Sequence, residues 1–252
     1  MTKTASILAC ATAVLALAGC HSKQSNQAAT DNAPVHYANL KPPAGGTWAD
    51  VINPTPDGGV MMGDPNAKVH LIEIGSLTCP HCQHFEETAV DKLVDKYVKT
   101  GQVSYEFRNY IRDSFDLAAV LIAKCNGPKS FFPLARAFYD TQPDWEGKLQ
   151  TAPKDQMEQL QALPPNQIEL QAAKIAGFLD WAAARGVPQA KSTQCLTDTN
   201  AINQLVAQSG SISDEYPDFN GTPNFVINGT LNNKIAEWEQ IDAALQSALA
   251  GK

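Results

Sequence analysis

The chain has 252 residues, enough for one domain with a large insertion or for two small domains. Its 26 acidic residues outnumber its 19 basic residues, which gives a formal net charge of −7, and the basic residues form no stripe along the sequence. This charge disfavours nucleic acid and anionic lipid headgroups as partners.

The first twenty residues have the features of an export signal that ends at a lipidation site. Lys3 precedes the apolar stretch Ala5–Leu17, which is too short to span a bilayer permanently. Residues 17–20, Leu-Ala-Gly-Cys, resemble a bacterial lipobox. We therefore expect a signal peptide over residues 1–19 and a lipid on Cys20. The alternative is an ordinary secretory signal with Cys20 left as a free thiol, and the chain is exported in either case.

Residues 20–62 are predicted to form a lipidated tether and an irregular lead-in to the folded body. The part from residue 21 to about residue 43 is rich in Ser, Asn, Gln, Ala and Pro and lacks hydrophobic periodicity. The Pro- and Gly-rich stretch Asn53–Gly63 is expected to pack irregularly on the body. No later apolar run approaches membrane length, so we expect a soluble body.

A strand, a helix and a second strand come next. Lys68–Ile74 is an apolar run typical of a buried strand, and residues 80–100 are predicted to form a helix that ends at Gly101. Val103–Arg108 alternates as a second strand. The apolar face of the helix consists of Phe85, Ala89, Leu93 and Tyr97.

The motif Cys79-Pro80-His81-Cys82 lies between the first strand and the helix. A thiol at a helix N-terminus meets unpaired backbone N–H groups and the positive end of the helix dipole, and both favour the thiolate. We therefore predict that Cys79 is a nucleophile. Cys82, one turn later, can attack a mixed disulfide formed by Cys79, so the pair can hold or release two electrons.

The same two cysteines are also compatible with other sites. Structural zinc usually needs a second Cys or His pair at short spacing, although His81 and His84 leave a metal site open. Haem attachment needs a histidine directly after the second cysteine, where this chain has Gln83. A disulfide between such close residues constrains the chain little. The order strand, CxxC, helix therefore favours redox chemistry.

Residues 113–210 have a helical pattern that proline, glycine and polar residues interrupt. Leu117–Lys124 has helical spacing, and further helices are predicted at Phe131–Tyr139, Gln167–Arg185 and Thr199–Ser209.

A hairpin and a last helix close the chain. Asn224–Ile227 is predicted to be a strand that turns through Asn228-Gly229 and resumes near Leu231. A final helix carries Trp238, Ile241, Leu245 and Ala248 on one face. This order of elements describes an α/β protein with a thioredoxin fold and an inserted all-helical domain. The two core parts are expected at residues 63–112 and 211–252, with the insertion at 113–210.

Cysteine counting suggests two disulfides. Cys10 leaves with the signal peptide and lipidation uses a second cysteine, so four of the six remain in a compartment where disulfides persist. Four cysteines allow three pairings, and the CxxC motif selects Cys79–Cys82 together with Cys125–Cys195. The alternative for the second pair is two independent buried thiols.

Two segments carry a resemblance to a known family. Residues 71–82, Leu-Ile-Glu-Ile-Gly-Ser-Leu-Thr-Cys-Pro-His-Cys, resemble the active-site segment of DsbA-like thiol oxidases. Residues 221–229, Gly-Thr-Pro-Asn-Phe-Val-Ile-Asn-Gly, resemble the cis-proline segment of the same family. The similarity covers roughly residues 63–250, although Gly75 stands where the family often has an aromatic residue. The Cys125/Cys195 pair resembles the second disulfide of some members.

The residues between the cysteines are predicted to tune the nucleophile. Pro80 suits the first helical position, where its missing N–H is not needed. His81 is expected to give a hydrogen bond or a positive charge to the Cys79 thiolate, which lowers the pKa and makes the disulfide a stronger oxidant. The alternative for His81 is an ordinary solvent-facing helix residue.

Three further residues gain roles from the resemblance. It implies that Glu73 is a buried acid beneath the active site that moves protons for Cys82, and the alternative is a glutamate on an exposed strand face. It also implies that Thr222 and Pro223 lie opposite the CxxC motif and pair with an extended substrate. The alternative for Pro223 is an ordinary trans proline in a turn.

The leading hypothesis is a lipid-anchored periplasmic thiol–disulfide oxidoreductase that oxidises cysteines in exported, partly unfolded proteins. We expect a monomer without cofactor or metal. A DsbB-type membrane reoxidase is expected to restore its Cys79–Cys82 disulfide. One alternative is a reductase or isomerase that a membrane donor keeps reduced. Another is a copper- or zinc-binding lipoprotein that uses Cys79, Cys82 and a nearby histidine.

Overall fold

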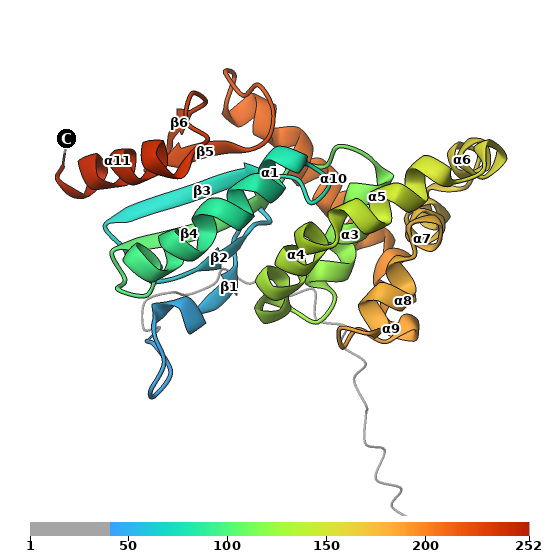
Figure 1. Cartoon of the computed structure of the whole chain (residues 1–252), viewed down its shortest axis with the longest axis horizontal. Helices are drawn as coiled ribbons and strands as arrows, with labels where there is room; N and C mark the ends of the chain where they lie inside the picture. Colours follow the sequence, from blue (N-terminus) through green and yellow to red (C-terminus); the bar gives the residue numbers. More distant parts are fainter. Residues whose placement is uncertain (1–40, 252) are drawn as a thin grey trace, which may run out of the picture. The chain divides into compact units, whose positions relative to one another are not determined.

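A six-stranded mixed sheet lies at the centre of the structure, a computed structural model that describes residues 41–251 (Figure 1). The strands follow the order β1-β2-β4-β3-β5-β6. β3 and β4 are parallel, and every other neighbouring pair is antiparallel. The strands are β1 (Ile52–Pro54), β2 (Val60–Met62), β3 (Val69–Gly75), β4 (Val103–Asn109), β5 (Asn224–Ile227) and β6 (Thr230–Asn232).

Several predictions fall on residues 1–40, which lie outside the described residues together with residue 252. These are the signal peptide over residues 1–19, lipidation of Cys20 and most of the tether. Within residues 41–251, no helix has both the length and the apolar character needed to cross a membrane.

The lead-in is more regular than the sequence predicts. After the 3₁₀ turn η1 (Trp48–Asp50), β1 and β2 form a hairpin in which Ile52 pairs with Met62. β2 extends the sheet because Val60 pairs with Phe107 of β4. The prediction of an irregular segment is therefore wrong here. That prediction rested on the Pro- and Gly-rich composition. Strands of three residues are too short to show an alternating pattern in the sequence.

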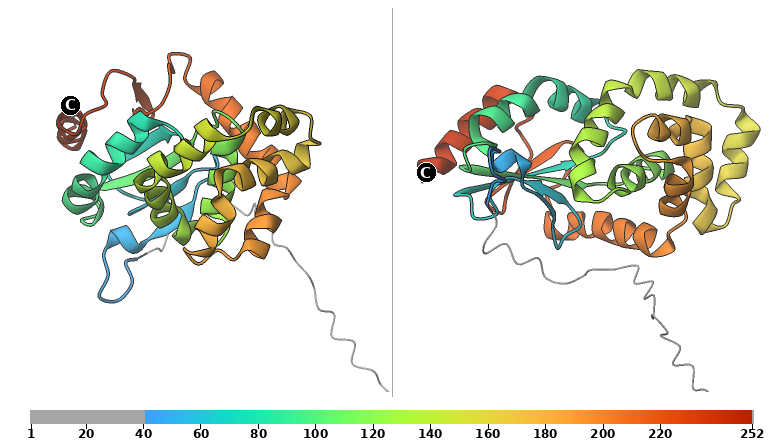
Figure 2. Two further views of the ribbon diagram at one scale, coloured as in Figure 1. Left: turned by 45° about the vertical axis from the view of Figure 1, so that its right-hand side comes forward. Right: turned by 90° about the horizontal axis from the view of Figure 1, so that it is seen from below.

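One continuous helix, called the CxxC helix below, covers residues 80–98. It consists of α1 (Pro80–Phe85) and α2 (Asp91–Leu93), each followed by a π-helical turn, η2 (Glu86–Val90) and η3 (Val94–Val98). With α11 (Trp238–Leu249) it packs on one face of the sheet, and α10 (Thr199–Glu215) packs on the other (Figure 2).

The side chains of β3 alternate between two cores, as strand geometry requires. Leu71 packs with Phe85 of the CxxC helix and Ile241 of α11. Ile74 packs on the opposite face with Ile212 of α10. The β5–β6 connection is the predicted two-residue turn, in which Asn228 and Gly229 both have the positive φ that a type I′ turn needs.

The helical insertion lies between β4 and β5. It contains the 3₁₀ turn η4 and eight helices, α3 to α10, among the described residues. Their bounds are α3 (Ser114–Lys124), η4 (Pro128–Ser130), α4 (Phe131–Asp140), α5 (Gln142–Thr151), α6 (Lys154–Gln161), α7 (Pro165–Ala176), α8 (Phe178–Ala183), α9 (Gln189–Leu196) and α10 (Thr199–Glu215).

The insertion differs from its prediction in three details. α10 continues to Glu215, past the predicted boundary at residue 210. The single helix predicted over Gln167–Arg185 is divided into α7 and α8 at Gly177, which has a φ of 75°. α5, α6 and α9 were not predicted, because they are polar helices with few buried residues to produce an apolar face.

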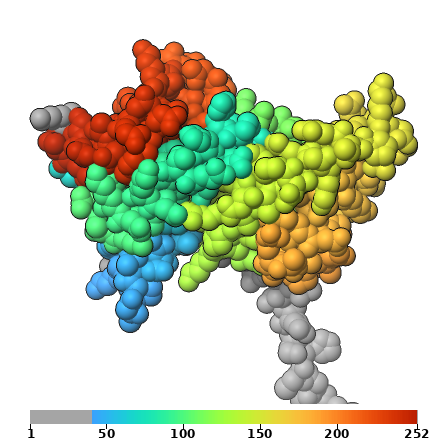
Figure 3. Space-filling model, in the orientation of Figure 1, coloured from blue at the N-terminus to red at the C-terminus, as the bar shows by residue number. Residues whose placement is uncertain are grey.

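Polar contacts connect the insertion to the CxxC helix. Arg136 of α4 forms ion pairs with Glu86 at 2.7 Å and with Asp91 at 2.6 Å. Gln83 donates a hydrogen bond to the Tyr139 carbonyl at 3.1 Å. In the space-filling view the CxxC helix (teal to green) therefore lies alongside α4 and α5 (yellow-green), with the C-terminal helix (red) on its other side (Figure 3).

A disulfide joins Cys125, at the end of α3, to Cys195 of α9. This is the pairing that cysteine counting favoured for these two residues. The bridge spans 70 residues of sequence and therefore ties the first helix of the insertion to its penultimate helix.

We expect the Cys125–Cys195 bridge to stay closed while Cys79 and Cys82 cycle. Peptide mapping under non-reducing conditions should find it in both redox states of the protein. Replacing both residues with serine is expected to lower the free energy of unfolding by about 4 kcal/mol, because the loop it closes is long. The Cys79→Ser/Cys82→Ser double variant is the control and should retain the bridge. Two free thiols at Cys125 and Cys195 in exported protein would contradict the prediction.

Candidate active site

Cys79 lies at the junction of the sheet and the CxxC helix. It occupies the N-cap position of α1 with an extended backbone, φ −92° and ψ 121°, and Pro80 begins the helix. Cys79 is 4% exposed and Cys82 is fully buried, and both are free thiols. Pro80 fits this position because the first helical N–H has no partner within a helix.

The surroundings of Cys79 favour its thiolate. A hydrogen bond from the Cys82 thiol lowers the pKa of Cys79 most, and burial opposes it. The Thr222 side chain and the backbone N–H groups of Cys82 and His81 lower it further, to about 5. The sulfur is therefore a thiolate at neutral pH and is ready to act as a nucleophile or as a leaving group.

Cys82 has the opposite properties. Burial raises its pKa well above the ordinary thiol value, and the nearby Cys79 and Glu73 raise it further. A hydrogen bond from the Ser76 backbone N–H opposes this shift. The two cysteines therefore differ in a way that suits different tasks, because only Cys79 is charged at neutral pH.

His81 contributes through its backbone at the Cys79 sulfur. Its N–H is among the donors that lower the pKa of Cys79, while the residue itself is exposed. Pro80 is also exposed. The predicted effect of the His81 imidazole on the pKa of Cys79 stays a prediction.

Glu73 is a buried acid beneath the two cysteines. It is 1% exposed, and its carboxylate accepts a hydrogen bond from the Tyr105 hydroxyl. Burial raises its pKa to about 8, although the Tyr105 bond lowers it. The alternative of an exposed strand glutamate is therefore wrong. With this pKa the carboxyl group is mostly protonated at pH 7 and can give a proton to a Cys82 thiolate, and its ionised form can take a proton from the Cys82 thiol.

Glu73→Gln is expected to stabilise the protein at high pH and to slow thiol exchange. A glutamate whose pKa rises from 4.5 to about 8 on folding loses stability as the pH rises, because the unfolded state ionises first. The variant should therefore gain about 3–4 kcal/mol over the wild type between pH 5 and pH 8. Urea unfolding at both pH values measures this, with Glu239→Gln, an exposed glutamate of α11, as the control. An equal pH dependence in wild type and variant would contradict it.

The segment before β5 faces Cys79. The Thr222–Pro223 peptide bond is cis, and the Cys79 sulfur lies 3.2 Å from the Thr222 carbonyl oxygen, to which it donates a hydrogen bond when it is protonated. Asn224 is buried and its side chain amide donates to the Gly221 carbonyl and to Asn220. The structure therefore brings Thr222 and Pro223 beside the CxxC motif, as the resemblance implied.

A residue that sequence reasoning missed is Asp116 of α3. It is fully buried and accepts hydrogen bonds from the Ser76 hydroxyl at 2.7 Å and from the Leu77 N–H at 3.0 Å. Burial raises its pKa to about 7 against the donors that lower it. A signal was present, because Asp116 is an acid inside an apolar helix, much as Glu73 is an acid inside an apolar strand.

Packing against β4 explains why position 75 is a glycine. A Cβ atom at this position would lie 2.6 Å from the ring of Phe107 on β4. Phe107 of the neighbouring strand therefore occupies the space that an aromatic side chain at position 75 would need.

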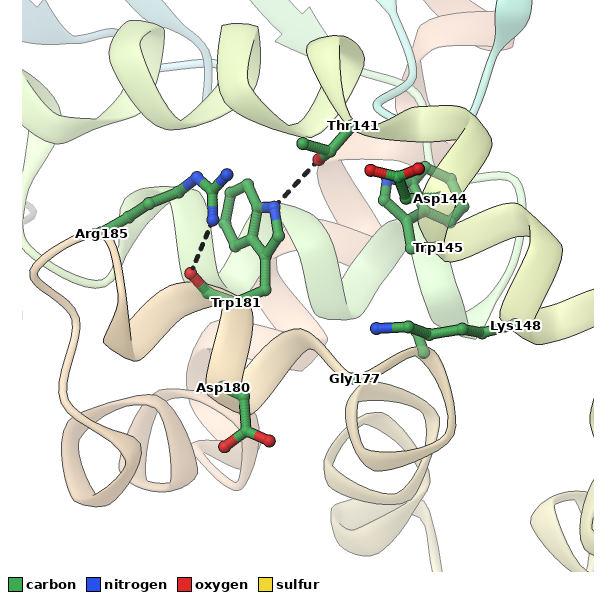
Figure 4. Close-up of a pocket in the computed structure, with 9 residues that line it drawn as sticks. Thr141, Asp144, Trp145, Lys148, Gly177, Asp180, Trp181 and Arg185 are labelled. Atoms are coloured by element: carbon green, nitrogen blue, oxygen red, sulfur yellow. Dashed lines mark hydrogen bonds between the residues drawn. The ribbon is translucent and has the colours of Figure 1, made fainter.

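A hollow of about 270 Å³ lies within the insertion between α5, α7 and α8 and contains neither thiol (Figure 4). Trp181 stacks on Phe138 with ring centroids 3.9 Å apart and carries the Arg185 guanidinium at 4.3 Å. Its ring is thus already engaged by neighbours, and none of the predicted site residues lines the hollow. Among residues 41–251, no group of three or more His, Cys, Asp and Glu side chains is placed to hold a metal ion.

Comparison with known families and solved structures places this geometry in context. The family model described as thioredoxin matches residues 55–247. A crystal structure described as a protein-disulfide isomerase from Novosphingobium aromaticivorans is 32% identical, with a TM-score of 0.72 over 77% of this chain and 98% of that chain. The alpha-DsbA1 of Wolbachia pipientis, 21% identical with a TM-score of 0.61, covers 81% of this chain and 97% of its own, and shares the fold.

Curated relatives are more distant in sequence. A protein from Rickettsia felis that carries the name of a protein-disulfide oxidoreductase is 27% identical over 194 residues, which are 77% of this chain and 61% of the relative. The thiol:disulfide interchange protein DsbA of Bordetella pertussis is 26% identical over 77% of this chain and 71% of its own length. The match thus spans about three fifths of the length of the Rickettsia relative.

Proposed function

Because this chain belongs to the thioredoxin family, among its DsbA-like members, we propose that it is a thiol–disulfide oxidoreductase that oxidises paired cysteines in exported proteins. The observation that carries the proposal is the contrast between the two thiols. Cys79 is a thiolate at a helix N-terminus with a pKa of about 5, and Cys82 is a buried neutral thiol beside it. A dithiol with one stabilised thiolate favours its reduced form, and its disulfide is correspondingly oxidising.

The proposed reaction starts from the Cys79–Cys82 disulfide. A substrate thiolate attacks the Cys79 sulfur, the bond to Cys82 breaks, and Cys82 leaves with the electron pair and takes a proton from Glu73. A second substrate thiolate then attacks the substrate sulfur of the mixed disulfide and displaces Cys79 as a thiolate. The substrate gains one disulfide and loses two electrons, which the enzyme now holds as its dithiol.

The substrate is proposed to be an unfolded or partly folded exported chain. Thr222 and Pro223 are partly exposed next to the Cys79 sulfur, so they are placed to contact the chain on either side of the attacked cysteine. We infer from the predicted signal peptide and from Cys20 that the enzyme is periplasmic and held to a membrane by lipid. A DsbB-type membrane protein would then reoxidise it, and a monomer suffices for every step.

The direct test uses the oxidised full chain and a reduced synthetic peptide with two cysteines. We expect one peptide disulfide to form for each Cys79–Cys82 disulfide consumed, as read by chromatography after acid quenching. In the control, oxidised glutathione at the same concentration replaces the oxidised chain, and it should oxidise the peptide more slowly. A peptide that stays reduced while the Cys79–Cys82 disulfide persists would overturn the proposed function.

A second direction of electron flow has one observation in its favour. The structure that is 32% identical is described as a protein-disulfide isomerase. An isomerase or reductase works in its dithiol form, which a membrane donor would maintain. The reduced chain would then rearrange a peptide with mispaired disulfides, and the oxidised chain would remain a poor oxidant. The same peptide assay, run from both redox states, separates the two directions.

A further inference from the structure

The backbone that leads into the CxxC motif is held by the insertion. Asp116 of α3 accepts from the Ser76 hydroxyl and from the Leu77 N–H, and its second oxygen also accepts from the Arg112 N–H at 3.0 Å. The Ser76 hydroxyl in turn accepts from the Thr78 N–H at 3.2 Å. Asp116 therefore holds Ser76 and Leu77 directly and Thr78 through the Ser76 hydroxyl.

Ser76, the first residue of this segment, contacts both cysteines of the motif. The Ser76 carbonyl accepts from the Cys79 N–H at 3.2 Å. A hydrogen bond from the Ser76 backbone lowers the pKa of Cys82, so the Ser76 N–H is a donor to the Cys82 sulfur. Two more side chains hold this segment. The Tyr139 hydroxyl of α4 donates to the Ser76 carbonyl at 3.0 Å, and Arg112, just before α3, donates to the Thr78 carbonyl at 2.8 Å. Ser76 is thus the link between the insertion and Cys82.

We propose that Asp116 is a positioning residue for the resolving cysteine: it holds the Ser76–Thr78 segment so that the Ser76 N–H stabilises the Cys82 thiolate when Cys82 attacks or leaves. This inference rests on the proposed thiol–disulfide chemistry and adds a role for the inserted domain. In the reaction written above, Cys82 carries a negative charge each time its bond to Cys79 breaks or forms. A backbone donor that is already aimed at the sulfur favours that charge.

The ionised form of Asp116, which predominates above its pKa of about 7, suits this task better than an amide of the same shape. One oxygen of Asp116 receives the Leu77 N–H and the other receives the Ser76 hydroxyl and the Arg112 N–H, so both oxygens act as acceptors. An asparagine has one oxygen and one NH₂ group, and the NH₂ would face a backbone N–H. One of the two backbone donors would therefore lose its partner in a fully buried site.

The test separates the two steps of thiol exchange with oxidised glutathione as the probe. In the first step the Cys79 thiolate attacks glutathione disulfide, which forms a mixed disulfide and releases one glutathione thiolate. In the second step Cys82 attacks the Cys79 sulfur and displaces the other glutathione. Acid quenching at short times followed by mass spectrometry measures both rates in the full chain.

Asp116→Asn is expected to slow the second step by about tenfold, the effect of one lost hydrogen bond to a charged group, and to leave the first step unchanged. Asp113→Ala is the matched control. Asp113 caps the same helix through the Phe115 and Asp116 N–H groups and touches none of the Ser76–Thr78 segment. It should lower stability and leave both rates unchanged. A wild-type second step in Asp116→Asn would overturn the proposal, as would an equal slowing in Asp113→Ala.

Ser76→Ala keeps the test decisive if Asp116→Asn does not fold. It removes the hydroxyl that donates to Asp116 and accepts from the Thr78 N–H, and we expect a second step about fivefold slower. In the double variant the two effects should combine to less than their product, since both act through one contact. Independent effects, or a wild-type rate in Ser76→Ala, would refute the role of Asp116. Because glutathione is the only partner, a failure of the peptide oxidation assay would leave this result interpretable.

Discussion

Replacing Cys82 with serine is expected to leave a protein that forms a mixed disulfide at Cys79 and cannot release it. The Cys79 thiolate, with its pKa of about 5, still attacks oxidised glutathione at neutral pH. The wild type then displaces the bound glutathione with Cys82 and ends as an internal disulfide. The variant lacks that thiol, so mass spectrometry should find one glutathione per chain that persists after the free glutathione is removed.

Cys79→Ser is the matched control and should form little or no adduct. Its remaining thiol, Cys82, is buried and has a pKa well above the ordinary thiol value. At pH 7 its thiolate fraction is therefore far below that of Cys79. The two variants differ from the wild type by one sulfur atom each, so only their different surroundings distinguish them.

The same pair of variants applies in cells that export the protein. Cys82→Ser should accumulate complexes with exported proteins that a reductant dissolves, and Cys79→Ser should not. Equal adduct formation by both variants would show that Cys79 and Cys82 do not have separate roles. The proposed order of attack would then be wrong, whatever the overall activity of the wild type.

The sequence predicts the position of Cys79 at a helix N-terminus because that geometry is local. The strand, the motif and the helix are contiguous, so the position of Cys79 at a helix N-terminus follows from residues 68–101 alone. The burial of Glu73 was implied by the family resemblance, since alternation along the strand also permits an exposed position. The Asn228-Gly229 turn follows from the conformations that a two-residue hairpin allows.

What the sequence does not predict depends on contacts between distant segments. β2 is a strand because Val60 and its neighbours pair with β4, which is more than forty residues away in sequence. Asp116 lies 40 residues from the Ser76 hydroxyl that it accepts from, and no spacing rule joins the two. Periodicity also fails for α5 and α6, since their few buried residues give no apolar face.

The site therefore has two layers of different origin. The thioredoxin core supplies the helix N-terminus, Glu73 and the Thr222–Pro223 segment around the sulfurs. The insertion supplies Asp116 and Tyr139, which hold the backbone just before Cys79. The insertion therefore helps to shape the active site, because it holds the backbone that leads into the CxxC motif.

The second large effect concerns the reduction potential of the Cys79–Cys82 pair, which we expect near −220 mV at pH 7. Thioredoxin has a nucleophilic cysteine with a pKa near 7 and a potential near −270 mV. A pKa of about 5 for Cys79 stabilises the reduced form further, by about 50 mV at pH 7. Equilibration with glutathione buffers, read by mass spectrometry or tryptophan fluorescence, measures the potential.

The pH dependence of that potential provides an independent check. Above pH 5 the reduced pair keeps one proton, on Cys82, so the potential should fall by about 30 mV per pH unit. Below pH 5 Cys79 also binds a proton, and the slope should double to about 59 mV. A potential near −270 mV with a single slope through pH 5 would contradict the low pKa of Cys79 and would favour the reductase direction.

His81→Ala decides which groups produce the shift. The backbone N–H groups of His81 and Cys82 remain in the variant, so the donors that the structure places at the Cys79 sulfur are retained. If those donors dominate, the thiolate absorbance near 240 nm should titrate within about one pH unit of the wild type, and the potential should change by less than about 30 mV. A larger rise in the pKa of Cys79 would instead assign the effect to the imidazole, as the sequence alone predicted.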